Sequence, residues 1–310
     1  MSFKLRLLLF YLNYFAKDNL STPPDQIRIS DQKELPKYLR IVENAPESLF
    51  EVRDQKIKVR DDQEITLRIY RPNDGQNLPL IIYYHGGGFV LRSLDSHDYV
   101  CRRISKMNNA VVVSVDYRLA PENKFPIPHQ DCYDATVWAV ENSDFLNISR
   151  QEVTVMGDSA GANLASVVSI LARDNNGPEI KNQVLIYPCC DSSKKYESEK
   201  NYAKGYFLTT ERMDWFTDHY IREEQDVFNP LVSPVLTEDL SDLPRAFVFT
   251  AEYDPLKDEG HAYAQRLEEA GNEVLYKEYP NVIHGFFNMP KISKECGMAN
   301  QDIRTFLQYS

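Results

Sequence analysis

The sequence predicts an α/β protein with a doubly wound, mostly parallel central sheet, and two observations lead to this prediction. Apolar runs recur along the chain, as is typical of strands buried on both faces. They cover residues 80–84, 110–115, 153–156, 183–187 and 246–250, and a last strand is predicted at 273–279. Stretches with helical periodicity alternate with them, at residues 96–107, 131–141, 160–174 and 260–270. This alternation favours parallel strands joined by right-handed crossovers.

Two segments depart from the alternation. Residues 51–60 and 65–70 alternate apolar and polar side chains around Asp61-Asp62-Gln63, which indicates an antiparallel hairpin ahead of the parallel strands. Residues 191–230 are polar and aromatic, with a helical stretch at 210–222. Because long insertions in α/β folds usually serve function, we interpret residues 191–230 as a cap insertion over the carboxyl edge of the sheet.

The first 48 residues are predicted to form a helical segment. Five apolar side chains recur there at helical spacing, which indicates an amphipathic helix: Leu5, Leu8, Leu9, Leu12 and Phe15. The apolar run at 7–12 is too short to span a bilayer, so we expect no stable membrane insertion. Packing against the rest of the protein is the favoured interpretation. Contact with a membrane surface and a weak export signal are the alternatives.

Composition excludes several classes of protein. The chain has 310 residues, of which 43% are hydrophobic and 26% charged, so it is neither disordered nor collagen-like nor a coiled coil. Its net charge of −11 and the lack of a long basic run make it a poor partner for nucleic acid. The five cysteines are odd in number and show no Cys-x-x-Cys spacing. We therefore expect free thiols, a cytoplasmic location and no metal.

Residues 157–161 read Gly-Asp-Ser-Ala-Gly and match the pattern Gly-x-Ser-x-Gly. A predicted strand precedes the motif and a predicted helix follows it, which is the context that raises a nucleophilic serine above a sheet edge. The helix N-terminus also favours negative charge beside the Ser159 hydroxyl. A small-residue turn with an incidental serine is the alternative.

Three consecutive glycines, Gly86, Gly87 and Gly88, follow His85 and the strand at 80–84. Such a run is costly in backbone entropy, so a structural reason is needed. Free N–H groups facing a ligand provide one: Gly87, Gly88 and Ala160 are the candidate oxyanion-hole donors. A flexible surface turn is one alternative. A phosphate-binding loop is disfavoured because no Gly-x-Gly-x-x-Gly or Gly-Lys-Ser/Thr pattern is present.

A nucleophilic serine needs a base and a carboxylate, which follow it in this architecture in the order Asp or Glu, then His. His284 is the only one of six histidines that follows the last predicted strand. Asp254 follows the strand at 246–250, and Asp258 is its close rival. Both Asp254 and His284 would lie past strand carboxyl ends, where parallel sheets place their sites. A surface histidine and a helix-capping aspartate are the alternatives.

Together these motifs resemble the hormone-sensitive-lipase family of α/β-hydrolases, bacterial type IV esterases included. The similarity extends from about residue 50 to the C-terminus and is carried by residues 85–89, 116–122, 157–164, 254–256 and 284–286. The resemblance implies an α/β-hydrolase catalytic domain at 49–310 that includes the cap insertion. It also implies that residues 1–48 form an N-terminal cap segment.

The resemblance implies hydrolysis of carboxylic esters with short to medium acyl chains, without a cofactor. Ser159 would attack the carbonyl to form an acyl-enzyme, with His284 as base and Asp254 orienting it. The partner is then a small ester; a homodimer is compatible with the sequence. Five aromatic residues of the cap insertion are expected to pack with the cap segment over Ser159 and wall an acyl pocket: Tyr206, Phe207, Trp215, Phe216 and Tyr220.

Two other functions use the same scaffold. Some relatives of the family are plant hormone receptors that lack the triad histidine. Because His284 is present here, an enzyme is favoured over such a receptor. Amide or thioester hydrolysis would use the same three residues, and the sequence does not choose between these substrates.

Overall fold

An eight-stranded mixed sheet forms the centre of the computed structural model, which describes residues 1–15, 20–33, 42–43 and 45–308. Its strands, in sequence, are β1 (Glu51–Lys58), β2 (Glu64–Arg71), β3 (Leu78–Tyr84), β4 (Val111–Asp116), β5 (Ile148–Asp158), β6 (Asn182–Ile186), β7 (Arg245–Tyr253) and β8 (Val274–Ile283). The spatial order is β1-β2-β4-β3-β5-β6-β7-β8. β2 runs antiparallel to both neighbours and the remaining pairs are parallel, which confirms the predicted hairpin and parallel sheet.

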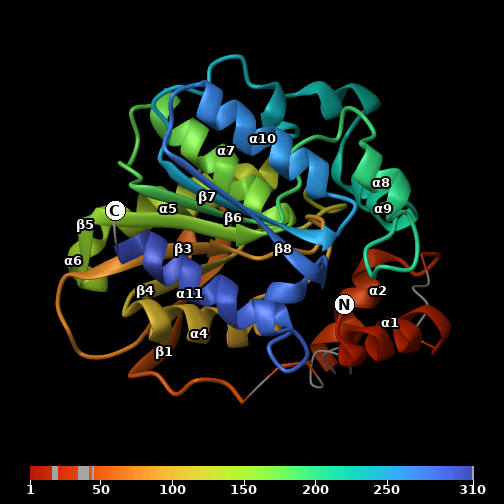
Figure 1. The fold of residues 1–310 in the computed structure, drawn as a ribbon. Helices are drawn as coiled ribbons and strands as arrows, with labels where there is room; N and C mark the ends of the chain where they lie inside the picture. The colour runs from red at the N-terminus through yellow and green to blue at the C-terminus, as the bar shows by residue number, and fades with distance from the viewer. Residues whose placement is uncertain (16–19, 34–41, 44, 309–310) are drawn as a thin grey trace.

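Helices cover both faces of the sheet (Figure 1). One face carries α5 (Ile127–Glu141), α7 (Ala160–Asp174) and α10 (Lys257–Glu269); the other carries α4 (Asp98–Asn108) and α11 (Lys294–Gln308). Short helical turns lie at α6 (Ser143–Leu146), Asp95–His97, Glu224–Phe228, Pro234–Leu236 and Phe286–Asn288. We did not predict α11 from the sequence, although its buried residues Cys296, Ala299 and Ile303 have helical spacing.

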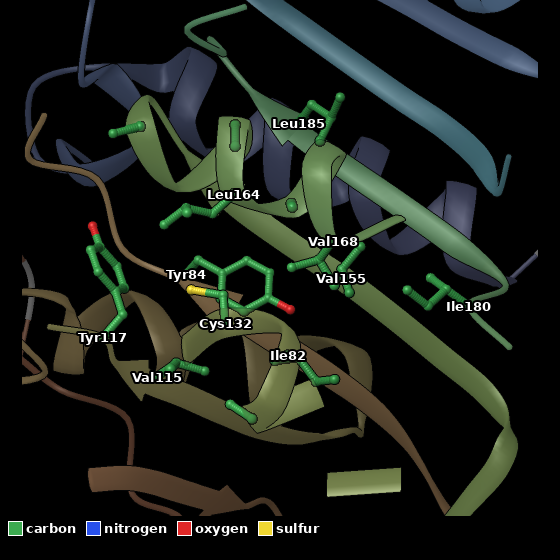
Figure 2. Close-up of a cluster of buried hydrophobic side chains, with 14 of the residues drawn as sticks. Ile82, Tyr84, Val115, Tyr117, Cys132, Val155, Leu164, Val168, Ile180 and Leu185 are labelled. Atoms are coloured by element: carbon green, nitrogen blue, oxygen red, sulfur yellow. The ribbon is translucent and has the colours of Figure 1, made fainter. Parts of the chain in front are cut away.

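The core has two layers because successive strand residues point to opposite faces of the sheet. Leu80, Ile82 and Tyr84 of β3 join the layer beneath α5 and α7, whereas Ile81 and Tyr83 join the layer beneath α4 and α11. Figure 2 shows side chains of the first layer interleaving between the sheet and α7. The continuous apolar runs in the sequence reflect this burial on both sides.

Four helices lie together at the end of the sheet where the parallel strands finish (Figure 1). They are α1 (Phe3–Phe15), α2 (Pro24–Lys33), α8 (Glu197–Asn201) and α9 (Thr210–Tyr220). α1 buries Leu5, Leu8 and Leu9 against Ile283 and Met289. The Trp215 indole N–H of α9 donates to the Leu20 carbonyl at 2.9 Å, which ties the cap insertion to the cap segment.

Part of the predicted cap segment lies outside the described residues, namely 16–19, 34–41 and 44. The side chain of Phe15, the last member of the predicted apolar stripe, also lies outside them. None of the described helices combines the length and hydrophobicity that crossing a bilayer requires.

Candidate active site

Ser159 lies in the tight turn between β5 and α7 with a positive φ of 56°, a strained value for a residue other than glycine. Its N–H donates to the Ile186 carbonyl at 2.9 Å, which anchors the turn to β6. A Cβ at Gly161 would lie 2.0 Å from the Tyr84 carbonyl oxygen, and one at Gly157 2.2 Å from the Gly161 oxygen. Both glycines of the motif are therefore steric requirements of this turn.

One hydrogen-bonded chain joins the three side chains that the sequence predicted to meet. His284 Nε2 lies 3.0 Å from Ser159 Oγ, and His284 Nδ1 lies 2.8 Å from Asp254 Oδ2. Asp254 is fully buried, and its second oxygen accepts the Leu256 N–H at 2.9 Å. With the ring proton on Nδ1 donated to the carboxylate, Nε2 is left to accept the hydroxyl proton.

Asp258, the rival carboxylate, faces elsewhere. Its Oδ2 accepts the backbone N–H of Ser198 at 2.8 Å, and the Ser198 hydroxyl is 3.2 Å from the Asp258 N–H. Asp258 thus joins the start of α10 to the cap insertion, while Asp254 holds the imidazole.

The glycine loop brings its backbone to the same point. Gly87 and Gly88 have φ values of +123° and +62°, which side chains rarely adopt. Among the described residues, no backbone carbonyl in a turn or loop accepts a hydrogen bond from the N–H groups of Gly87, Gly88 and Ala160. A Cβ at Gly88 would meet the Phe216 ring at 2.2 Å, so the cap insertion packs directly on this loop.

Asp158, between Gly157 and Ser159, has a role that the sequence analysis missed. Its Oδ1 accepts the Tyr83 hydroxyl at 2.7 Å and the Gly86 N–H at 3.0 Å, and lies 3.2 Å from His97 Nε2. Burial alone would raise the pKa of Asp158, but His97 and these hydrogen bonds lower it to about 2. An ionised Asp158 therefore ties the nucleophile turn to the glycine loop. The sequence did contain one indication of this role, since an ionisable residue at the end of a buried strand needs a polar partner.

His85 packs next to the glycine loop that follows it. Its Nδ1 lies 2.7 Å from the Gly86 carbonyl, and its ring stacks on Tyr117 with centroids 4.4 Å apart. Burial lowers the pKa of His85 to about 3, so the ring is neutral. Among the described residues, no group of three or more His, Cys, Asp or Glu side chains is arranged to hold a metal ion.

A cavity of about 1010 Å³ opens over Ser159. Phe207, Phe216 and Tyr220 of the cap insertion line it, as do Tyr11 and Leu12 of α1. Tyr206 and Trp215 do not line this cavity, so the expectation of a pocket wall was wrong for them, but both pack with the cap segment as expected. Tyr206 stacks on Tyr253 with centroids 5.5 Å apart, and Trp215 is held by its bond to Leu20.

Comparison with known proteins places this geometry in a family. The sequence model described as the alpha/beta hydrolase fold matches residues 81–288. The chain belongs to the α/β-hydrolase family. An arylesterase of Saccharolobus solfataricus is 43% identical in sequence to this α/β-hydrolase. The alignment covers 79% of the present chain and 80% of the arylesterase. An ethyl acetate hydrolase of Pseudomonas putida is 38% identical over 79% and 78% of the two chains.

A solved structure is similar over nearly the whole length. The hyperthermophilic esterase of the archaeon Pyrobaculum calidifontis superposes on this α/β-hydrolase with a TM-score of 0.94 and 42% sequence identity. The match covers 100% of the chain described here and 98% of that esterase. These relatives confirm the predicted membership of the hormone-sensitive-lipase type and the prediction of an ester hydrolase, and they do not favour the receptor alternative.

Proposed function

We propose that this chain hydrolyses carboxylic esters with Ser159 as nucleophile, His284 as general base and acid, and Asp254 as the group that orients His284. The observation that carries the proposal is the hydrogen-bonded chain from Ser159 through His284 to Asp254 beneath a large cavity. Each member comes from a different strand end, so the sheet itself holds their relative positions.

In the first half of the reaction, His284 Nε2 takes the proton of the Ser159 hydroxyl while Oγ attacks the ester carbonyl carbon. Negative charge then develops on the carbonyl oxygen. We assign the N–H groups of Gly87, Gly88 and Ala160 to stabilise it, since preorganised donors at such a position lower the barrier. His284 next gives its proton to the leaving alkoxide, and the C–O bond breaks to leave an acyl-enzyme on Ser159.

The second half repeats these roles with water. His284 removes a proton from a water molecule, the resulting hydroxide attacks the acyl carbonyl, and the proton returns to Ser159 Oγ as the acid leaves. Asp254 favours the cationic imidazole that forms twice in the cycle, because its buried carboxylate faces Nδ1 at 2.8 Å. The steps need no cofactor.

Esters with short to medium acyl chains are the proposed substrates. Phe216 packs on Gly88 and lines the cavity together with Phe207 and Tyr220, so an apolar wall stands next to the proposed oxyanion hole. Burial of acyl carbon on such a wall contributes roughly 0.8 kcal/mol per CH₂. The names of two relatives, an arylesterase and an ethyl acetate hydrolase, agree with small esters.

Steady-state kinetics on p-nitrophenyl esters of increasing acyl length test this proposal. We expect kcat/KM to rise with acyl length and then fall, and Ser159→Ala to lower kcat by about a thousandfold or more for every ester. Matched thioesters and amides are run in the same series. Retention of more than about a tenth of wild-type activity by Ser159→Ala would reject the nucleophile, because losing a triad member costs orders of magnitude.

The compartment and the partners are inferred from less direct features. All five cysteines are free thiols, four of them buried, which supports a reducing compartment such as the cytoplasm. The acidic composition argues against nucleic acid as a partner. A homodimer stays a prediction.

A further inference from the structure

Helix α1 is apolar on two opposite faces. Leu5, Leu8 and Leu9 are buried against the rest of the protein. On the other side the exposed fractions are 81% for Phe3, 58% for Leu7, 53% for Phe10 and 67% for Tyr14. Because an α-helix turns by about 100° per residue, these four side chains form one stripe roughly opposite the buried leucines.

This exposed stripe is unusual for the molecule. Of the eleven large apolar side chains that are exposed in the described part of the chain, five lie on this helix of 13 residues. Single exposed apolar residues are common on soluble proteins and need no explanation. A contiguous set on one helix marks a surface that binds something.

The charge around the stripe favours one kind of occupant. Lys4 and Arg6 are exposed and lie on the two sides of the stripe, and α1 contains no acidic residue. The exposed Lys291 is adjacent, since its carbonyl lies 3.5 Å from Lys4 Nζ. The chain as a whole has a net charge of −11, but salt screens charges more than about 8 Å away. The two borders of the stripe on α1 are therefore basic and suit an anionic surface, while the half-buried Glu43 is close to Lys291.

We propose that the exposed face of α1 binds an anionic phospholipid bilayer, with the helix lying in the plane of the lipid–water interface. An apolar stripe bordered by basic side chains is the pattern of helices that bind in this way. A second copy of the chain is a poorer occupant. Two stripes packed together would bring Lys4 and Arg6 of both copies close to each other, with no acid on α1 to neutralise them.

Binding of the stripe to a bilayer would also help ester hydrolysis, a consequence that rests on the proposed function. Tyr11 and Leu12, on the same helix, line the cavity that contains Ser159. In Figure 1, α1 lies at the end of the sheet where α8 and α9 also lie. Docking through α1 would hold the cavity close to esters dissolved in the bilayer.

Flotation with extruded vesicles tests the proposal on the full chain. Vesicles of phosphatidylcholine mixed with phosphatidylglycerol are compared with pure phosphatidylcholine, at low and at high salt. Wild type is expected to bind the anionic vesicles, and high salt is expected to release it. Phe3→Ser/Leu7→Ser and Lys4→Glu/Arg6→Glu should each lower the partition coefficient by at least about tenfold.

Two controls separate this proposal from others. Phe228→Ser removes an equally exposed ring, 63% accessible, that is not on α1, and it should bind vesicles like wild type. Ser159→Ala should also bind like wild type, so the surface is tested independently of the catalytic assignment. All surface variants should keep wild-type kcat on a water-soluble ester, which verifies their fold.

Wild type that fails to bind anionic vesicles, or α1 variants that bind as well as wild type, would overturn the proposal. A dimer in analytical ultracentrifugation that Phe3→Ser/Leu7→Ser abolishes, without vesicle binding by wild type, would assign the stripe to a second copy and equally reject it.

Discussion

Individual residues around Ser159 are fixed by more contacts than the serine motif suggests. Asp158 binds Tyr83, Gly86 and His97 below the turn, and Gly161 leaves room for the Tyr84 carbonyl. The positive φ of Ser159 is maintained because neighbours on both sides hold it in place. The position of Ser159 therefore depends on side chains outside the triad.

Asp254→Asn and Asp258→Asn form a matched pair of substitutions. Asp254→Asn should lower kcat by about a thousandfold or more, because the amide no longer favours the imidazolium or the Nδ1–H tautomer of His284. Asp258→Asn should keep kcat within about threefold, since Asp258 contacts Ser198 and not the imidazole. Steady-state kinetics on one p-nitrophenyl ester measures both. The reverse ranking would show that the orienting carboxylate is misassigned.

Asp158 should make stability depend on pH in acid. Its pKa in the folded protein is about 2, below the ordinary 3.8, so its ionised form stabilises the fold at neutral pH. That contribution, about 2 kcal/mol from the size of the shift, is lost as pH falls from about 5 towards 2. Urea titrations followed by circular dichroism should give a steeper acid loss in wild type than in Asp158→Asn.

Asp74→Asn, which removes an exposed carboxylate, is the control for that titration and should follow the wild-type curve. Parallel curves for wild type and Asp158→Asn would contradict the assigned role of the Asp158 carboxylate.

At the scale of elements, the cap insertion contacts the site at two glycines. Phe216 of α9 packs on Gly88, and Phe207 lies 3.3 Å from where a Cβ on Gly285 would be, beside His284. A side chain on Gly88 would push Phe216 away, whereas one on Gly285 would make only a tight contact with Phe207. α9 thus shapes the acyl pocket and supports the glycine loop together.

Phe216→Ala should enlarge the acyl pocket next to Gly88. Longer acyl chains can then bury at least one more CH₂, worth roughly 0.8 kcal/mol, so the ratio of kcat/KM for hexanoate over acetate should change by about fourfold or more. Phe228→Ala is the matched control, because Phe228 lies in the cap insertion, is 63% exposed and does not line the cavity. Equal chain-length profiles for all three proteins would show that α9 does not form the acyl wall.

Most of the sheet could be predicted because its strands are buried on both faces and bounded by turns. The hairpin at β1 and β2 and the parallel strands followed from alternation and connection rules, whereas the spatial order of the strands was not predicted. Helix ends were less accurate: α5 begins at Ile127, four residues before the predicted start at 131. α11 was not predicted because its few apolar residues are interspersed with polar ones, so the helical periodicity is weak in the sequence.

The candidate site was predictable where chemistry demands particular residue types in a fixed order. Ser159, Asp254 and His284 do lie in one hydrogen-bonded chain, although their catalytic roles stay predictions. Contacts between distant segments were not predictable. Nothing local shows that His97 faces Asp158, or that Trp215 turns towards residue 20 while its neighbour Phe216 faces the cavity.

At the scale of the whole molecule, the sheet, the cap insertion and the cap segment converge on one point. β5, β7 and β8 lead to Ser159, Asp254 and His284, and helices of both cap parts line the cavity above them. The fold therefore separates two tasks. The sheet holds the three reacting side chains, while the helices of the cap segment and the cap insertion shape the cavity for the substrate.

Covalent labelling with a fluorophosphonate, located by peptide mass spectrometry, tests the central claim most directly. The account predicts one phosphonyl group per chain, on Ser159, with activity lost in proportion to labelling. Labelling should be much slower in His284→Ala, because Nε2 no longer takes the hydroxyl proton at 3.0 Å. Inactivation with the label on another residue, or full esterase activity with Ser159 unlabelled, would contradict the account.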